Sequence, residues 1–209
     1  MGGGGRGREE GGRGQRETSN ITCQSAYLEL RKLRLIRHVL TVGATKTLVT
    51  SLALSRLDYC NSLLSRIPQQ LIDKLQKVQN CSGRFICKTS KRPHVSPLLS
   101  KLHRLPIAQR IDYKISSYCY DVVTDTATLY LSDLLCINVL SHSQRSSADT
   151  RIFRIPKRKK KFKGQRAFFH LGPVTWNKLP YSVRRTQTQP QFKTQLKTTL
   201  FRSVYELDS

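Results

Sequence analysis

The sequence predicts a mainly α-helical protein that consists of a helical bundle, a small basic C-terminal module and a disordered N-terminal tail. Two observations carry this prediction of the fold class. Apolar residues recur at spacings of three and four from residue 21 onward, which is the pattern of amphipathic helices. The first eighteen residues consist almost entirely of glycine, arginine and glutamate, so they have nothing to bury in a core.

The composition describes a globular and strongly basic chain. It has 209 residues, of which 38% are hydrophobic, so a real core can form. Its 37 Lys and Arg residues face only 13 Asp and Glu residues, which gives a formal net charge of +24. A surplus of this size attracts polyanions, so nucleic acid is the leading expected partner, and anionic membrane surface and the ribosome are the alternatives. No apolar run approaches the roughly 18–20 residues that a membrane span requires, so no membrane partner is expected.

The six cysteines and the N-terminus predict where the chain resides. The cysteines are scattered without a CxxC pair, and the start of the chain lacks the apolar core of a signal peptide. We therefore expect reduced thiols and a nuclear or cytoplasmic protein that is not secreted. The KRKKK run that begins at Lys157 fits a nuclear import signal.

The first predicted elements are the disordered tail, residues 1–18, and a helix that starts at Ile21 and ends before Gly43. The helix is the first element of a predicted helical domain that covers residues 19–140, and the tail precedes this domain. The apolar positions of the first helix share one face, and cations occupy the positions between them. The predicted core positions are Tyr27, Leu30, Leu33, Leu35, Ile36 and Val39, and the cations are Arg31, Lys32, Arg34 and Arg37.

Three further helices are predicted within this domain, over about residues 44–64, 69–88 and 107–124. Each has one apolar stripe at helical spacing. The expected core positions of the second are Leu48, Leu52, Leu57 and Leu64. Those of the third are Leu71, Leu75, Val78, Ser82 and Phe85, and those of the fourth are Ile111, Ile115, Tyr118 and Val122.

The C-terminal third has the highest density of positive charge. Residues 141–209 hold 16 Lys or Arg and 3 Asp or Glu. We expect a basic linker over residues 141–166, followed by a small aromatic and helical module over residues 167–209. Its last helix places Phe192, Leu196 and Leu200 on one face. Trp176 and Phe168 are expected in a small core of this module, and the alternative is that they stack on a base.

The densest cluster of cations is the run RIPKRKKKFKGQR, which begins at Arg154 and contains no acidic residue. An exposed linker of this charge can bind phosphates without being folded. It is the predicted nucleic-acid contact, and the alternative is a solvated segment with no binding role. The predicted binding residues are Arg154, Lys157, Arg158, Lys159, Lys160, Lys161, Lys163 and Arg166.

No catalytic or metal-binding constellation can be assembled from the sequence. Asp121 and Asp125 stand one helical turn apart, but no third carboxylate has a matching spacing, so we interpret them as solvated helix-end residues. The set Cys81, Cys87, His94 and His103 lacks the usual spacing of a zinc site. Cys60 and Cys81 are instead expected to be buried thiols. We therefore predict no catalytic residue, no metal, no cofactor and no enzymatic activity.

The order of several motifs resembles the C-terminal region of LINE-type, jockey-like non-LTR retrotransposon reverse transcriptases. The similarity covers about residues 19–202. It is carried by SRLDYCNSLL at 55–64, LQKVQN at 75–80, LHRLPIAQRI at 102–111 and the AF…P..WNKLP element at 167–180. The catalytic palm and the endonuclease of that family lie N-terminal to this region, and the chain has no Asp-Asp dipeptide onto which catalytic residues could be carried over.

The resemblance implies a helical thumb and a C-terminal extension, the parts expected to grip RNA and DNA through phosphates. The chain would then be a truncated, inactive fragment that keeps sequence-independent binding to RNA or an RNA–DNA hybrid. An alternative is a reading frame over a decayed element without selected function, and a partial polymerase or nuclease is the third hypothesis. Uncovered helix faces would favour self-association. Candidate phosphate contacts on the polar helix faces are Arg31, Arg34, Lys74, Lys77 and Lys114.

Overall fold

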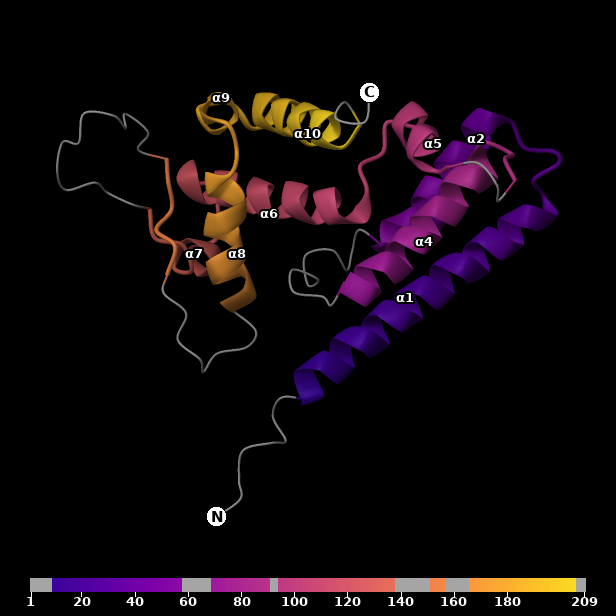
Figure 1. Cartoon of the computed structure of the whole chain (residues 1–209), viewed down its shortest axis with the longest axis horizontal. Coiled ribbons are helices and arrows are strands. Elements are labelled where there is room, and N and C mark those ends of the chain that lie inside the picture. The colour runs from indigo at the N-terminus through magenta and orange to yellow at the C-terminus, as the bar shows by residue number, and fades with distance from the viewer. Residues whose placement is uncertain (1–8, 58–68, 91–93, 138–150, 157–165, 206–209) are drawn as a thin grey trace, which may run out of the picture. The chain divides into compact units, whose positions relative to one another are not determined.

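The computed structural model describes residues 9–57, 69–90, 94–137, 151–156 and 166–205 (Figure 1). Within these residues the chain is mainly α-helical, and its only β contact is an isolated bridge between Ile137 and Phe153. The prediction of a mainly α fold is confirmed. The chain divides into two compact units, residues 1–110 (unit 1) and 111–209 (unit 2), and each is described by itself.

Unit 1 opens with a long helix, α1 (Glu9–Leu35), which starts well before the predicted position. The helix therefore includes residues 9–18 of the predicted tail, while residues 1–8 lie outside the described part of the chain. Extending a helix costs much less than starting one, so the segment that packs from Ser19 onward lets the helix propagate toward the N-terminus.

The second helical segment changes type along its length. α2 (Val42–Leu48) begins at Thr41, whose Oγ1 accepts a hydrogen bond from the Ala44 N–H at 3.2 Å. It continues as the π-helix η2 (Val49–Leu54), and residues 55–57 are α-helical again. Side-chain hydroxyls of Thr50 and Ser51 donate to backbone carbonyls of this segment and so compete with the regular ladder. Residues 58–64 of the predicted helix lie outside the described residues.

The helix α4 (Gln69–Ile86) follows its predicted range closely and supplies the clearest core stripe. Leu71, Leu75, Val78 and Ser82 are buried as predicted, and Phe85 is half-buried. Two side chains of α4 also fasten the chain that follows α5 (Ser96–Lys101). Gln79 Nε2 donates to the Leu105 carbonyl at 2.8 Å, and Gln76 Oε1 accepts from the Ile107 N–H at 2.9 Å. The start of the next helix is therefore held by α4.

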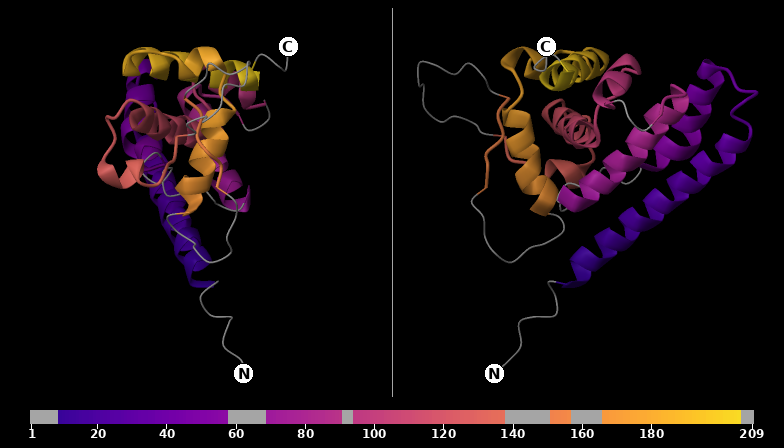
Figure 2. Two further views of the ribbon diagram at one scale, coloured as in Figure 1. Left: turned by 90° about the vertical axis from the view of Figure 1, so that its left-hand side faces the viewer. Right: turned by 45° about the vertical axis from the view of Figure 1, so that its right-hand side comes forward.

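Helices α1 and α4 lie side by side and run in the same direction (Figures 1 and 2). Lys74 Nζ, in the first third of α4, donates to Asn20 Oδ1, near the middle of α1, at 3.2 Å. At their far end the Arg37 guanidinium donates to the Ile86 carbonyl at 3.1 Å. The segment η2 packs against both helices, which completes a three-helix bundle. Its core includes Leu30 and Leu33 of α1, as predicted, and Val49, Ala53, Leu54 and Leu57.

The face of α1 differs from the predicted one beyond Leu33. Leu35 is exposed at the end of the helix, and so are Ile36 and Val39 in the turn that follows. Arg37, predicted on a polar face, is buried instead. It donates to the carbonyls of Phe85, Ile86 and Leu40 and lies over the Phe85 ring. The chain leaves the helical path after Leu35, so helical spacing no longer decides which side chains turn inward. Leu52, another predicted core position, is also exposed.

Unit 2 is built on α6 (Ile107–Val123), α7 (Leu129–Ser132), α8 (Arg166–Asn177), α9 (Tyr181–Arg184) and α10 (Gln189–Tyr205). Its core is aromatic. Tyr120 of α6 stacks on Phe192 of α10 with ring centroids 4.2 Å apart, and Trp176 of α8 lies 5.7 Å from the same ring. This packing groups most of α6 with the C-terminal helices, so the structural division after Arg110 differs from the predicted boundary at 140/141.

Part of the predicted basic linker is fixed to this core. Phe153 is buried beside Trp176, with ring centroids 5.9 Å apart. Asn177 pairs with the Phe153 backbone in both directions, accepting from its N–H at 3.1 Å and donating to its carbonyl at 2.8 Å. Trp176 Nε1 donates to the Arg151 carbonyl at 2.7 Å. Residues 151–156 are therefore anchored rather than a free connection between folded parts.

Candidate nucleic-acid interface

The structure describes only part of the predicted basic run. Arg154 is exposed, and its N–H donates to the Cys136 carbonyl at 2.9 Å, so its position follows from the anchored segment. Arg166 begins α8, but its side chain lies outside the described part of the chain. The remaining predicted residues also lie outside it, namely Lys157, Arg158, Lys159, Lys160, Lys161 and Lys163. The prediction that this run contacts nucleic acid therefore stays a prediction.

A second group of cations lies on the α1/α4 pair. Asn20, Tyr27, Arg31 and Arg34 recur along one side of α1 at spacings of seven, four and three. Lys74, Lys77 and Cys81 do the same along one side of α4. The bond between Lys74 and Asn20 and the contact between Cys81 and Tyr27 join these two sides. We call the resulting surface the α1–α4 basic surface, and its cations are Arg31, Arg34, Lys74 and Lys77.

All four cations of the α1–α4 basic surface are exposed, as their predicted polar faces require. Lys74 contacts a neutral amide, and none of the four forms an ion pair with a carboxylate of the described residues. Lys114, the fifth predicted contact, is half-buried and belongs to unit 2. The surface thus concentrates positive charge that no described acidic group neutralises.

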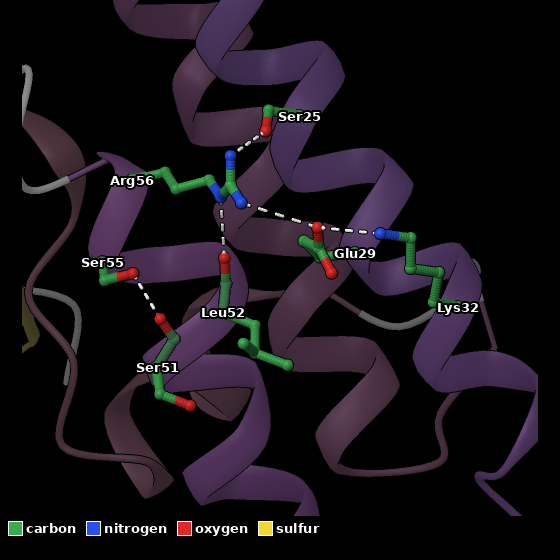
Figure 3. A network of polar contacts seen from close by, with 7 residues as sticks. All are labelled: Ser25, Glu29, Lys32, Ser51, Leu52, Ser55 and Arg56. Atoms are coloured by element: carbon green, nitrogen blue, oxygen red, sulfur yellow. Dashed lines mark hydrogen bonds and ion pairs between the residues drawn. The ribbon is translucent and has the colours of Figure 1, made fainter.

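Glu29, an acidic residue of α1, points toward Arg56 and Lys32 (Figure 3). Glu29 lies 3.2 Å from Lys32 Nζ and 3.5 Å from the Arg56 guanidinium. Arg56 also contacts Ser25 and donates to the Leu52 carbonyl at 3.2 Å, so this network joins α1 to the η2 segment. Asp73 of α4 accepts a hydrogen bond from Gln69 at 2.9 Å. Neither Glu29 nor Asp73 forms an ion pair with a cation of the α1–α4 basic surface.

Tyr27 adds an aromatic ring to the α1–α4 basic surface, with 42% of the residue exposed. Partial burial, followed by the nearby Cys81 and Cys23 thiols, raises the pKa of Tyr27 to about 12. The phenol therefore stays uncharged at neutral pH, and no phenolate repels a phosphate. Sequence reasoning placed this ring in the core, because its spacing from Leu30 is helical. Tyr27 thus faces solvent, whereas Trp176 is fully buried, as predicted for a core residue, and cannot stack on a base.

Cys81 is exposed beside Tyr27, so the prediction of a buried thiol was wrong for this residue. It lies on the solvent side of α4 because it shares the spacing of Lys74 and Lys77 rather than that of the buried stripe. Cys60, the other predicted buried thiol, lies outside the described residues. An exposed thiol within the basic surface provides a chemical probe of binding there.

The described residues contain no group of three or more His, Cys, Asp or Glu side chains that could hold a metal ion. Asp121 and Asp125, the two carboxylates that stand one helical turn apart in the sequence, lie in different surroundings. Asp121 accepts from Gln189 Nε2 at 2.8 Å, and Asp125 is exposed just past the end of α6 with a positive φ of 54°. The described helices also include none that is long and apolar enough to cross a membrane.

No protein-family model, curated protein or solved structure matches this chain.

An apolar stripe lies next to the basic surface on α1. Ile21, Leu28 and Leu35 follow one another at intervals of seven residues and are 65%, 55% and 77% exposed. A spacing of seven keeps them near one face of the helix. Several large exposed apolar side chains on one helix face commonly mark an interaction site. This stripe gives the predicted self-association a defined surface.

We expect self-association through this stripe to increase with salt. Two copies that each carry a net charge of +24 repel one another, and salt screens that repulsion while the apolar attraction remains. Sedimentation velocity between about 0.05 M and about 0.5 M salt should show a rising average mass. The variant I21Q/L28Q/L35Q should stay monomeric, whereas L129Q, at a residue of α7 that is 85% exposed and lies outside this stripe, should behave like the unmodified protein. A triple variant that associates equally would show that another surface is responsible.

Proposed function

We propose that this protein binds nucleic acid through phosphates, without sequence specificity, and that the α1–α4 basic surface is its principal contact. The observation that supports the proposal is the arrangement of Arg31, Arg34, Lys74 and Lys77. Two parallel helices present these exposed cations on one side, and no carboxylate of the described residues pairs with them. Phosphate contacts of this kind supply affinity and orientation but carry no base sequence.

The geometry suits a nucleic-acid backbone. Residues three apart on a helix are displaced by about 4.5 Å along its axis and lie on the same side. Arg31 and Arg34 therefore form one pair of neighbouring cations on α1, and Lys74 and Lys77 form another on α4. Flexible side chains at this spacing can reach successive phosphates along a strand.

The resemblance to the thumb-like region of non-LTR retrotransposon reverse transcriptases supports the same proposal. It suggests RNA or an RNA–DNA hybrid as the nucleic acid, recognised by backbone and shape. The proposal assigns no catalytic residue. Because the contacts are made to phosphates, hybrids of unrelated sequence are expected to bind with equal affinity.

A salt series tests the function itself. Binding of the full chain to a fluorescent RNA–DNA hybrid is measured by anisotropy between about 50 and 200 mM salt. Four phosphate contacts should make log K fall with log salt at a slope of about −4, and further cations would make it steeper. Absence of binding at the lowest salt, or affinity that does not depend on salt, would show that the proposal is wrong.

Thiol protection tests where the nucleic acid binds. Cys81 is exposed in the α1–α4 basic surface, and Cys136 is exposed in unit 2 beside the backbone of Arg154. Alkylation of each thiol is followed by peptide mass spectrometry with and without saturating hybrid. We expect the hybrid to slow the alkylation of Cys81 several-fold. Protection of Cys136 alone would assign the contact to the basic run that begins at Arg154, and would contradict the α1–α4 assignment.

A further inference from the structure

A pocket in unit 2 lies outside the α1–α4 basic surface and has a different composition. It opens at the bend between α9 and α10, and Ser182 and Thr186 contribute to its wall. The functional groups around it are one phenol ring, one guanidinium and three side-chain amides. These belong to Tyr181, Arg185, Gln187, Gln191 and Gln195. No acidic residue lines this pocket, which we call the α9–α10 pocket.

The wall of the α9–α10 pocket is held by groups from the core of unit 2. The Thr186 carbonyl accepts hydrogen bonds from the Tyr120 hydroxyl at 3.2 Å and from Arg151 Nη1 at 3.1 Å. Arg151 Nη1 also donates to the Arg184 carbonyl at 3.0 Å, and Arg184 Nε donates to the Leu179 carbonyl at 3.1 Å. The bend is therefore fixed before any ligand arrives, which lowers the entropy that binding would cost.

The side chains around this bend provide three kinds of contact. The Tyr181 residue is 44% exposed, so part of its ring is open to a planar partner. The exposed Arg185 guanidinium lies over one face of this ring, 5.9 Å from its centroid, so a stacked group takes the opposite face while the guanidinium binds an anion beside it. Gln191 and Gln195 are exposed one helical turn apart on α10, and each amide both donates and accepts hydrogen bonds.

These three contacts match the three parts of a nucleotide. Aromatic rings stack on bases, guanidinium groups bind phosphates, and glutamine amides bind the hydrogen-bonding edges of bases. A duplex hides its base faces, so only an unpaired nucleotide can present a base to Tyr181. An acidic peptide would use Arg185 but would leave the ring and the amides without matching groups.

We propose that the α9–α10 pocket binds one unpaired nucleotide, with its base stacked on Tyr181, its base edge on Gln191 and Gln195, and its phosphate on Arg185. The inference rests on the proposed nucleic-acid binding and adds a preference for a single-stranded segment. The α1–α4 basic surface would supply salt-dependent affinity for any strand, and this pocket would distinguish unpaired from paired nucleotides.

The test uses the full chain and a single-stranded RNA that carries 2-aminopurine, whose fluorescence is quenched when it stacks. We expect quenching on binding to the unmodified protein and to Y181F. The variant Y181A should lose the quenching and bind the single strand roughly 5- to 100-fold more weakly, as expected for one stacked base, while it binds an RNA–DNA hybrid normally. The control Y130A changes a tyrosine of α7 that is 56% exposed, and it should behave like the unmodified protein.

A second variant separates the pocket from any effect of Y181A on folding. Q191A/Q195A changes two exposed positions of α10 and should weaken single-strand binding several-fold while the hybrid still binds. Normal hybrid binding without quenching, or quenching that survives Y181A, would overturn the pocket and leave the proposed function standing. Absence of binding to both the hybrid and the single strand would overturn both proposals.

Discussion

The variant R31Q/R34Q/K74Q/K77Q is expected to bind an RNA–DNA hybrid roughly a thousand-fold more weakly than the unmodified protein near physiological salt. Each neutralised cation removes one phosphate contact and the counterion release that accompanies it. The slope of log K against log salt should therefore become shallower by about 3 to 4 units. All four side chains are exposed, so the fold should tolerate the changes. Anisotropy across a salt series measures both quantities.

A matched control separates the surface from the total charge of the chain. The variant K32Q/K46Q/R56Q/K101Q also removes four exposed cations of unit 1. These cations lie outside the α1–α4 basic surface. In the order given, they lie on the η2 side of α1, on α2, directly after η2 and on α5. It should lose much less affinity, because these side chains do not share one side of the α1/α4 pair. Equal losses in the two variants would mean that binding follows net charge alone, and the α1–α4 assignment would then fail.

The second large effect is expected from W176A, which should destabilise the protein by about 3 to 5 kcal/mol. Trp176 is fully buried, and its ring lies 5.9 Å from Phe153 and 5.7 Å from Phe192 between centroids. Its Nε1 also donates to the Arg151 carbonyl at 2.7 Å. Alanine would leave a large cavity and an unsatisfied carbonyl at once, and both cost free energy.

Urea unfolding followed by far-ultraviolet circular dichroism measures this effect without relying on tryptophan fluorescence. W176F should lose less of the free energy of unfolding than W176A, because it keeps an aromatic ring in the core. It should still be less stable than the unmodified protein, because it lacks the hydrogen bond to the Arg151 carbonyl. Y130A serves as the control, since this tyrosine is 56% exposed and should change the stability little. A W176A variant as stable as the unmodified chain would mean that unit 2 does not depend on this aromatic core.

Helical periodicity was sufficient to predict the range and the buried residues of a helix that has one covered face along its whole length. It predicted the range of α4 and its buried residues Leu71, Leu75 and Val78, and it predicted α6 to within a residue at each end. It was insufficient at helix ends and turns. The early start of α1 and the exposed residues after Leu33 depend on where neighbouring elements stop, and one sequence window does not contain that information.

The candidate sites divide in a similar way. Arg31, Arg34, Lys74 and Lys77 could be predicted as solvent-facing cations, because they lie off the apolar stripes. That they share one side was not predictable, since it depends on the parallel packing of two helices whose joining contacts are 54 and 49 positions apart in the chain. The α9–α10 pocket was missed for the same reason. The only feature of the sequence that points to this pocket is the cluster of glutamines between residues 187 and 195. Such a cluster does not by itself predict that the side chains line a pocket.

Local chemistry along the chain was enough to specify a basic, mainly helical protein, because helix periodicity and net charge are properties of neighbouring residues and of composition. Packing between distant segments decided the rest. It buried Arg37 against the carbonyls at the end of α4, exposed Tyr27 and Cys81, and fixed residues 151–156 to the aromatic core. Each of these outcomes depends on which partner covers a side chain, and the fold alone brings those partners together.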